Sequence, residues 1–531
     1  MKLVNLLALF GLKSAEWWEP RDSYGLSDEG IVDLGYVRYA GRQDPSVGVT
    51  TFYGLHYAHA PVGGRRWRAP VPIEDNSPLY FSSGVQDATV SAASCIQGVP
   101  DWPAPGYPDW EVDLDAPSSE DCLTLNVQVP MSVSQNSSLP VLLDIHGGGY
   151  LAGSSGDQGS YMIQRSNGSM IYVSINYRLG LYGFLAGNEV RKNGDLNVGL
   201  LDQRAAIEWV YRHISAFGGD PEKITLIGDS AGGGSVSYQL AFSKNDKRRP
   251  FRGAIIQAPW GPPSFSEQTQ QRLFDRTLAM SGCDSLDCLR GLDEEALRMV
   301  SQATFADVDL AQHGHGLYLF SPVVDNKFVT HPLSQLFLDG HHADLPLMIT
   351  RATKEGEPFT SLSLMAYNQT QALTNSLEEL QRIFPLMDTA TMGKFLSYYP
   401  PVQFPNVFDH RAKWFGDVMI NCVSYNAANS PTLQPKYKLV FEHGGLVHSS
   451  AAPYIYSSDT EASVLDKHTS HVLVQHIVDF VTTGSLSSAW PQYGTDKTVL
   501  HMSVEGQKLM HDPDDTAQCQ FILESTNILS I

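Results

Sequence analysis

The chain has 531 residues, of which 42% are hydrophobic, and its 57 acidic and 36 basic residues give a net charge of −21. Proteins that bind nucleic acid need basic patches, and the longest basic run here is Lys247-Arg248-Arg249, so nucleic acid is excluded as a partner. No Ser/Gly-rich tract, run of like charge or internal repeat divides the chain, which favours one elaborate domain over residues 16–531.

The first residues favour a signal peptide over residues 1–15. Met1-Lys2 is followed by a stretch from Leu3 to Leu12 that is apolar except for Asn5. About ten apolar residues suit the core of a signal peptide, whereas a membrane span needs about 20. The alternative is an ordinary amphipathic N-terminal helix. No later stretch is long and apolar enough to cross a bilayer, so no integral membrane association is expected.

The cysteines and glycosylation sequons also favour the secretory route. The six cysteines are few for this length but even in number. Three sequons begin at Asn136, Asn167 and Asn368 and provide acceptor sites for glycans. Together with the leader, they indicate a secreted protein from an oxidising compartment.

From residue 139 to residue 257, strand-like runs alternate with helical patterns. Residues 140–145, 170–175, 223–227 and 253–257 read as strands, and residues 199–214 read as a helix. This alternation predicts an α/β fold with a large, mostly parallel central sheet and helices on both of its faces. Such sheets place their active sites at the carboxyl ends of the strands.

A glycine cluster, His146-Gly147-Gly148-Gly149-Tyr150, follows the first of these strands. Consecutive glycines let the main chain bend until two N–H groups converge on one point. The N–H groups of Gly148 and Gly149 are therefore candidates for an oxyanion hole. The alternative is a flexible turn.

Gly228-Asp229-Ser230-Ala231-Gly232 follows the third strand and fits the pattern Gly-x-Ser-x-Gly. In this pattern a strand turns abruptly into a helix and exposes a serine, while the glycines leave room for neighbouring backbone. The helix that begins at Ala231 directs its N–H groups and its positive dipole end toward Ser230. The pattern predicts Ser230 as a nucleophile and the Ala231 N–H as a third oxyanion donor.

These motifs and their neighbours resemble the type-B carboxylesterase family, which includes cholinesterases and fungal secreted lipases. Residues 119–126 (Ser-Glu-Asp-Cys-Leu-Thr-Leu-Asn), 176–184 and 197–204 resemble segments of that family, and the resemblance is continuous from about residue 30 to 260. Hormone-sensitive-lipase-like esterases resemble the glycine loop and carry aspartate before the serine, as Asp229 does here. They are shorter and lack the Glu-Asp-Cys-Leu segment, which decides for the type-B family.

The resemblance implies an α/β-hydrolase fold and a Ser–Glu–His triad whose acid follows the serine in the chain. Residues 345–350 read as a strand that leads to Glu355-Gly356, which resembles the strand-end Glu-Gly of the family. Glu355 is therefore the predicted acid. Glu357 lacks the following glycine, and Asp325 resembles a structural segment of the family.

Two histidines follow the strand over residues 437–441 and are candidates for the base. His448 precedes small residues and then Pro453-Tyr454, which resembles the segment of the catalytic histidine, whereas His443 resembles the end of the strand. We therefore predict His448 as the base. The family usually has an acidic residue three positions later, where this chain has Ala451.

The resemblance also bears on the disulfides and the substrate pocket. It implies Cys95–Cys122 and Cys283–Cys288 bridges, which leaves Cys422 and Cys519 as a third pair that sequence alone cannot establish. The first bridge would close a loop that carries three aromatic residues. These residues, which would line the active site or anchor the loop by packing, are Trp102, Tyr107 and Trp110.

The predicted function is hydrolysis of a carboxylic ester, of a small molecule or a lipid, through an acyl-enzyme on Ser230. Trp260, just past the fourth strand, and Asp229 are expected to contribute to the substrate pocket. An acyltransferase or a lactone-forming or lactone-opening enzyme would use the same triad, and a non-catalytic binding protein would keep the fold. No cofactor is implied, and the histidine doublets at 341–342 and 313–315 lack the further ligands of a metal site.

Overall fold

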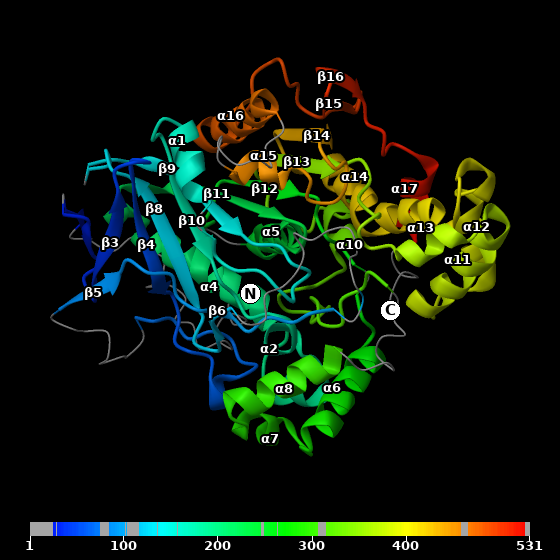
Figure 1. The fold of residues 1–531 in the computed structure, drawn as a ribbon, viewed down its shortest axis with the longest axis horizontal. Coiled ribbons are helices and arrows are strands. Elements are labelled where there is room, and N and C mark those ends of the chain that lie inside the picture. The colour runs from blue at the N-terminus through cyan, green and yellow to red at the C-terminus, as the bar shows by residue number, and fades with distance from the viewer. Residues whose placement is uncertain are drawn as a thin grey trace, which may run out of the picture.

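The structure is a computed structural model that describes residues 25–27, 29–74, 84–100, 102, 116–134, 136–156, 158–245, 249–262, 264–305, 315–457 and 466–525. The predicted signal peptide, Tyr107 and Trp110 lie outside these residues. A 14-stranded sheet runs through the described part of the chain in the order β1-β2-β3-β4-β8-β10-β9-β11-β12-β13-β14-β15-β16, with β5 paired to β3 (Figure 1).

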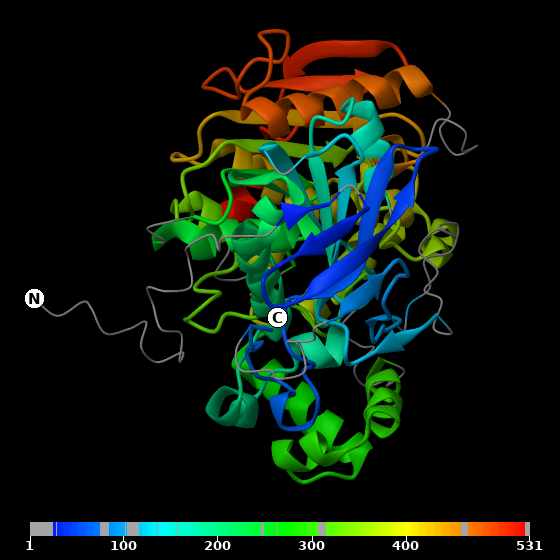
Figure 2. The ribbon, with the colours of Figure 1, turned by 90° about the vertical axis from the view of Figure 1, so that its left-hand side faces the viewer.

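The N-terminal strands, coloured blue and light blue in Figure 2, pair mainly antiparallel and were not anticipated from the sequence. They are β1 (Gly25–Leu26), β2 (Ile31–Asp33), β3 (Arg38–Asp44), β4 (Val49–His56), β5 (Val85–Ala88) and β8 (Thr124–Pro130). A separate two-stranded sheet pairs β6 (Ser94–Cys95) with β7 (Ser118–Ser119).

The central strands are parallel, as the alternating pattern predicts, from β10 through β9 and onward to β15. They are β9 (Leu139–Ile145), β10 (Ile171–Ile175), β11 (Gly219–Asp229), β12 (Gly253–Gln257), β13 (Leu347–Ala352), β14 (Lys436–Glu442) and β15 (Thr498–Ser503), followed by the antiparallel strand β16 (Gly506–His511). β11 begins four residues before the predicted strand, because Gly219 already pairs with Leu139 of β9.

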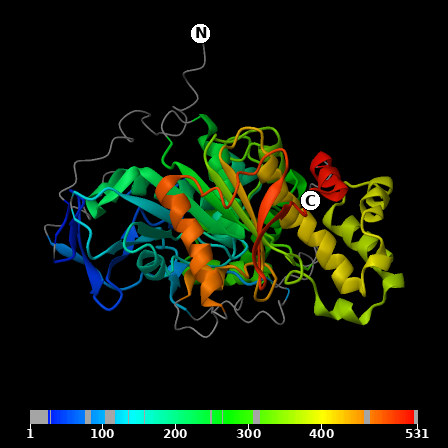
Figure 3. The ribbon, with the colours of Figure 1, turned by 90° about the horizontal axis from the view of Figure 1, so that it is seen from above.

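Helices cover both faces of this sheet, and each face has its own hydrophobic core. Leu142 of β9 packs in one core with Ile477 of α16 (Lys467–Thr483), the orange helix that crosses the sheet in Figure 3. Its neighbour Leu143 points to the opposite core, with Trp209 of α4 (Val198–His213). Successive residues of a strand face opposite sides, so a strand buried on both faces is apolar throughout.

The remaining helices complete the two layers or form two smaller groups at the margin of the sheet (Figure 1). They are α1 (Gly159–Arg165), α2 (Gly180–Phe184), α3 (Asn188–Asn193), α5 (Ala231–Phe242), α6 (Glu267–Ser281), α7 (Leu286–Gly291), α8 (Glu294–Phe305), α10 (Leu333–Leu338), α11 (Gln369–Ile383), α12 (Thr389–Ser397), α13 (Val407–Gly416), α14 (Cys422–Asn429), α15 (Ala452–Tyr456) and α17 (Ala517–Glu524). Among the described residues, none of the helices is long and apolar enough to span a bilayer.

A buried charge cluster fastens the segment after β16 to the two strands that lead to Glu355 and His448. Lys438 of β14 contacts Asp512 at 2.8 Å and Asp514 at 2.7 Å, and Arg351 of β13 contacts Asp514 at 2.6 Å. All four side chains are buried. Each charge therefore has a partner, as buried charges require.

Three disulfides are present: Cys95–Cys122, Cys283–Cys288 and Cys422–Cys519. The first two are the pairs that the family resemblance implies. The third joins the start of α14 to α17, across 97 positions of the sequence.

Candidate active site

Ser230 occupies the sharp turn between β11 and α5. Its φ of 59° and ψ of −122° place it in a region that residues other than glycine rarely adopt. The turn is held by hydrogen bonds from the Ser230 N–H to the Gln257 carbonyl and from the Trp260 N–H to the Ser230 carbonyl, both 3.0 Å long. A Cβ at Gly232 would lie 2.0 Å from the carbonyl oxygen of Ile145, so this close approach needs glycine. The observed geometry is that of the predicted strained strand-to-helix turn.

The glycine loop after β9 passes directly beside Ser230. A Cβ at Gly147 would lie 2.7 Å from the Asp229 carbonyl oxygen and 3.2 Å from the Ser230 Cβ. Gly148 and Gly149 have φ values of 97° and 62°, which glycine adopts without strain. The loop and the first turn of α5, with Ala231, therefore border the same point in space.

Glu355 and His448 meet in the interior, from two different loops. His448 Nδ1 lies 2.5 Å from Glu355 Oε2, and the other carboxylate oxygen accepts the Ala352 N–H at 2.5 Å. Glu355 is 1% exposed and His448 is 3% exposed. A bridge between the loops, in which the Lys354 N–H donates to the Leu446 carbonyl at 2.8 Å, holds the two residues together.

The two alternative residues weighed from the sequence are engaged elsewhere. His443 Nδ1 hydrogen-bonds with the Tyr454 hydroxyl at 2.8 Å, and its Nε2 lies 3.4 Å from Asp466, the N-cap residue of α16. Glu357 pairs with Lys354 at 2.9 Å. His443 therefore fastens the loop that carries His448 to α15 and α16.

Asp229 links the serine turn to the histidine loop. The Ser449 hydroxyl donates a hydrogen bond to the Asp229 carboxylate, so the residue before Ser230 contacts the residue after His448. The sequence suggested a place for Asp229 in the substrate pocket, and the structure directs its carboxylate to Ser449. This contact brings the segments of Ser230 and His448 together.

The charges around this link alter several pKa values. Burial alone would lower the pKa of His448, but the carboxylates of Glu355 and Asp229 raise it above its ordinary value. Burial raises the pKa of Asp229 to about 6, against the opposing effects of His448 and Ser449. Burial also raises the pKa of Asp144, in the adjacent strand β9, to about 7, although the Tyr172 hydroxyl donates to its carboxylate at 2.9 Å.

Aromatic rings surround the site. The Phe359 ring lies 5.0 Å from the His448 ring and 4.7 Å from the Trp260 ring, measured between centroids. Tyr318 lies 5.4 Å from Trp260, and a Cβ on Gly149 would lie 2.4 Å from the Tyr318 ring. Trp102 lies 5.4 Å from Tyr318 and donates its indole N–H to the Leu317 carbonyl at 2.8 Å.

Trp260 and Trp102 are candidates from their sequence positions, whereas no motif assigns Tyr318 or Phe359 to the site. Phe359 follows the predicted acid by four residues, which was the one available signal. Tyr318 is distant in sequence from every motif, and packing alone brings it to Gly149.

The three sequon asparagines, Asn136, Asn167 and Asn368, are exposed, as a glycan requires. Among the described residues, no group of three or more His, Cys, Asp or Glu side chains is placed to hold a metal ion.

The chain is similar to known carboxylesterases and lipases over most of its length. The profile described as "Carboxylesterase family" matches residues 29–522. Carboxylesterase patB of Aspergillus clavatus is 29% identical over 92% of this chain and 95% of its own length. The secreted triacylglycerol lipase LIP1 of Gibberella zeae is 31% identical over 70% of this chain and 68% of its own length. The crystal structure of Aspergillus niger EstA superposes with a TM-score of 0.81 at 27% identity, over 95% of this chain and 99% of that one.

Proposed function

The chain belongs to the carboxylesterase family and is a serine carboxylic-ester hydrolase, and we propose that Ser230, Glu355 and His448 are its catalytic triad. The observation that carries this proposal is the buried hydrogen bond of 2.5 Å between His448 Nδ1 and Glu355. With Nδ1 engaged by the acid, Nε2 is the nitrogen that takes the proton from a nucleophile. The Asp229–Ser449 contact, which joins the neighbours of Ser230 and His448, supports Ser230 as that nucleophile.

The reaction proceeds in two halves through an acyl-enzyme. His448 Nε2 takes the proton of the Ser230 hydroxyl as its oxygen attacks the ester carbonyl, and the proton then passes to the departing alcohol. Water next attacks the acyl-serine, gives its proton to His448, and the acid leaves as Ser230 recovers that proton. Glu355 orients the imidazole and stabilises its protonated form. No cofactor takes part.

The N–H groups of Gly148, Gly149 and Ala231 form the oxyanion hole in this proposal. The close approach of Gly147 to Ser230 and the position of Ala231 in the first turn of α5 support it. Each donor of this kind contributes about a hundredfold to a thousandfold in rate.

Trp260 forms the acyl side of the substrate pocket, together with Phe359 and Tyr318. The support is the chain of ring contacts from His448 through Phe359 to Trp260. We infer that these large rings restrict the acyl side of the pocket, so that short acyl groups are preferred. Asp229 acts through Ser449 as a positioning residue.

The enzyme is secreted as a single domain over residues 16–531, after removal of residues 1–15. Three disulfides support an oxidising compartment, and the similar lipase of Gibberella zeae is named as secreted. The exposed asparagines Asn136, Asn167 and Asn368 are the glycosylation sites.

The test is hydrolysis of p-nitrophenyl esters from acetate to palmitate by the wild type, Ser230→Ala and Ser237→Ala. Ser237 is a matched control, because among the described residues its hydroxyl bonds within α5, to the Gly233 carbonyl at 2.8 Å. We expect the Ser230 variant to lose activity and labelling by a fluorophosphonate while it keeps its thermal stability. Full activity of that variant would refute the nucleophile, and transfer to added alcohol in place of hydrolysis would favour the acyltransferase.

A further inference from the structure

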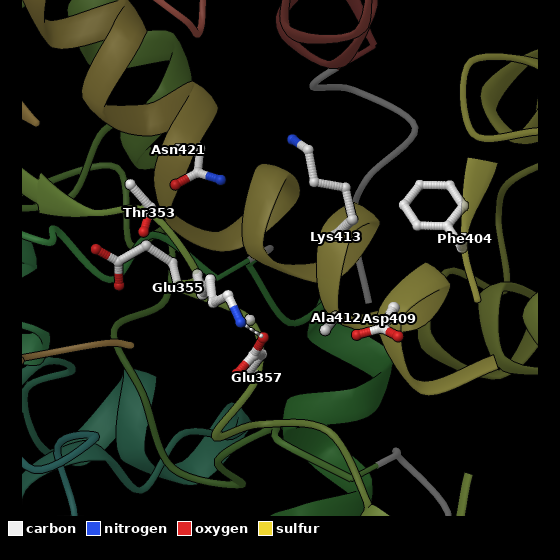
Figure 4. A pocket seen from close by; sticks show the side chains of 10 residues that line it. Thr353, Glu355, Glu357, Phe404, Asp409, Ala412, Lys413 and Asn421 are labelled. Carbon is white, nitrogen blue, oxygen red and sulfur yellow. Dashed lines mark ion pairs between the residues drawn. The ribbon is translucent and has the colours of Figure 1, made fainter. Parts of the chain in front are cut away.

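A pocket of about 190 Å³ opens beside the turn that carries Glu355 (Figure 4). None of its lining residues belongs to the Ser230 turn or to the glycine loop. One wall is the segment from Thr353 to Glu357, which follows β13. The other wall comes from α13 and from the π-helical turn Asp417–Asn421 that connects α13 to α14. π turns are rare and concentrate at functional sites.

Asn421 lines this pocket and carries a side-chain amide whose two ends differ in their partners. Its side-chain Nδ2 donates to Asp417 Oδ1 at 2.8 Å, and since a carboxylate only accepts, the amide cannot be turned the other way. The amide oxygen therefore faces away from Asp417. Asn421 is only 4% exposed, and its Oδ1 has no hydrogen-bond partner among the described residues. Buried acceptors are nearly always satisfied, so this oxygen is available to accept a hydrogen bond from a donor that enters the pocket.

Asp409 supplies an uncompensated negative charge on the other side of the pocket (Figure 4). Lys413, one helical turn further along α13, would be its usual partner, but Lys413 contacts Asp417 at 2.6 Å instead. The second lysine of the lining, Lys354, pairs with Glu357 at 2.9 Å. Within the part of the chain that the structure describes, the Asp409 carboxylate has no side-chain partner.

We propose that this pocket binds a small aliphatic amine that carries a second N–H or O–H donor, such as an amino alcohol or a diamine. The protonated amine pairs with Asp409, the second donor bonds to Asn421 Oδ1, and the carbon chain packs along the Phe404 ring that borders the pocket. Both lysines are neutralised by their carboxylates, so the local field favours a cation over an anion. The segment from Thr353 to Glu357 also carries Glu355, the proposed catalytic acid. The ligand therefore binds next to the loop that holds this acid.

Calorimetric titration of the full chain, without any ester, tests this proposal with three probes of the same length. These are 4-aminobutan-1-ol, butane-1,4-diol and succinate. We expect the amino alcohol to bind at least about tenfold more tightly than the diol, because it alone adds a charged donor, and succinate not to bind. Equal affinity for the amino alcohol and the diol, or binding of none of the probes, would overturn the proposal.

Substitutions locate the site. Asp409→Asn, at a partly exposed position, should weaken the amino alcohol about fivefold to tenfold, and Asn421→Ala should weaken the amino alcohol and the diol alike. Glu295→Gln removes a first-turn acid from α8, outside the pocket, and should leave the affinities unchanged. If Asp409→Asn bound the amino alcohol with unchanged affinity, the proposed site would be refuted, even if Asn421→Ala failed to fold.

Discussion

Exchange of Glu355 for glutamine should remove most of the activity while the fold persists. Glu355 Oε1 accepts the Ala352 N–H, and in the variant the amide oxygen must take that place. The amide NH₂ then faces His448 Nδ1, which lies 2.5 Å from the carboxylate in the wild type. A donor there holds the imidazole in the tautomer with its proton on Nε2, so that His448 cannot accept the Ser230 proton.

The magnitude follows from the charge that is lost. A carboxylate and an imidazolium about 4 Å apart attract by about 4 kcal/mol at an effective dielectric constant of about 20, and a charged hydrogen bond adds about 1.5 kcal/mol. At about 1.36 kcal/mol per factor of ten, their loss predicts a fall in kcat/KM of about 10⁴-fold. A loss of this size is typical when the acid of a serine hydrolase triad becomes an amide.

The assay is kcat/KM for p-nitrophenyl acetate from about pH 5 to 9. In the proposed mechanism His448 must be neutral to act, and its pKa is raised, so the rate of the wild type should fall as pH drops through a midpoint above about 6.5. In Glu355→Gln the midpoint of the residual activity should move to lower pH, because a cause of the raised pKa is gone. A loss of less than about tenfold, or an unmoved midpoint, would refute the reasoning.

Glu442→Gln provides the matched control. It breaks a similar histidine–carboxylate contact, since Glu442 lies 2.6 Å from His501, but its carboxylate is half-exposed and outside the proposed site. We expect kcat/KM to stay within about twofold of the wild type, because an exposed pair contributes little.

Three further predictions concern stability and specificity. The pKa of Asp144 is about 7 in the folded state, above its unfolded value, so the free energy of unfolding should fall as pH rises from about 4 to 7. In urea unfolding at pH 8, Asp144→Asn should raise the free energy of unfolding by up to about 4 kcal/mol. Removal of the Cys422–Cys519 bridge, which spans 97 positions, should lower the free energy of unfolding by about 2–4 kcal/mol. Trp260→Ala should raise kcat/KM for p-nitrophenyl octanoate relative to acetate by about tenfold.

Each of these has its own control. The Asp144→Asn effect must vanish below about pH 4, where the wild-type carboxyl is protonated in both states; a constant difference would contradict the electrostatic cause. Removal of Cys283–Cys288, five positions apart, should destabilise about half as much, and equal losses would argue against loop entropy. Trp209→Ala, an equally buried tryptophan of α4, should leave the octanoate preference unchanged.

The parts of the site that are local in sequence could be predicted. The strand, the serine and the flanking glycines of residues 223–232 lie together, and the steric demand for glycine at Gly232 is visible in the motif itself. The same holds for Glu355 and His448, each of which follows a recognisable buried strand. Parallel pairing then brings the ends of those strands to one edge of the sheet.

What the sequence could not reveal depends on long-range packing. The Asp229–Ser449 hydrogen bond joins residues 220 positions apart, and neither residue belongs to a pattern that names the other. The position of Tyr318 over Gly149 likewise depends on how a loop folds back onto the sheet. The antiparallel strand β3 escaped prediction because its sequence, Arg-Tyr-Ala-Gly-Arg-Gln-Asp, is largely polar and alternates in polarity only weakly.

The buried cluster of Lys438, Arg351, Asp512 and Asp514 sets an order on biosynthesis. The two cations lie on strands that leave the ribosome well before the two aspartates, so a growing chain that has made β13 and β14 still lacks their counterions. Isolated buried cations are strongly unfavourable, so we expect the strands that lead to the proposed acid and base to pack stably in the sheet only once Asp514 has emerged. We therefore expect the proposed acid and base to reach their final places only after this distal segment has been translated, and the Cys422–Cys519 bridge then keeps the segment attached to α14.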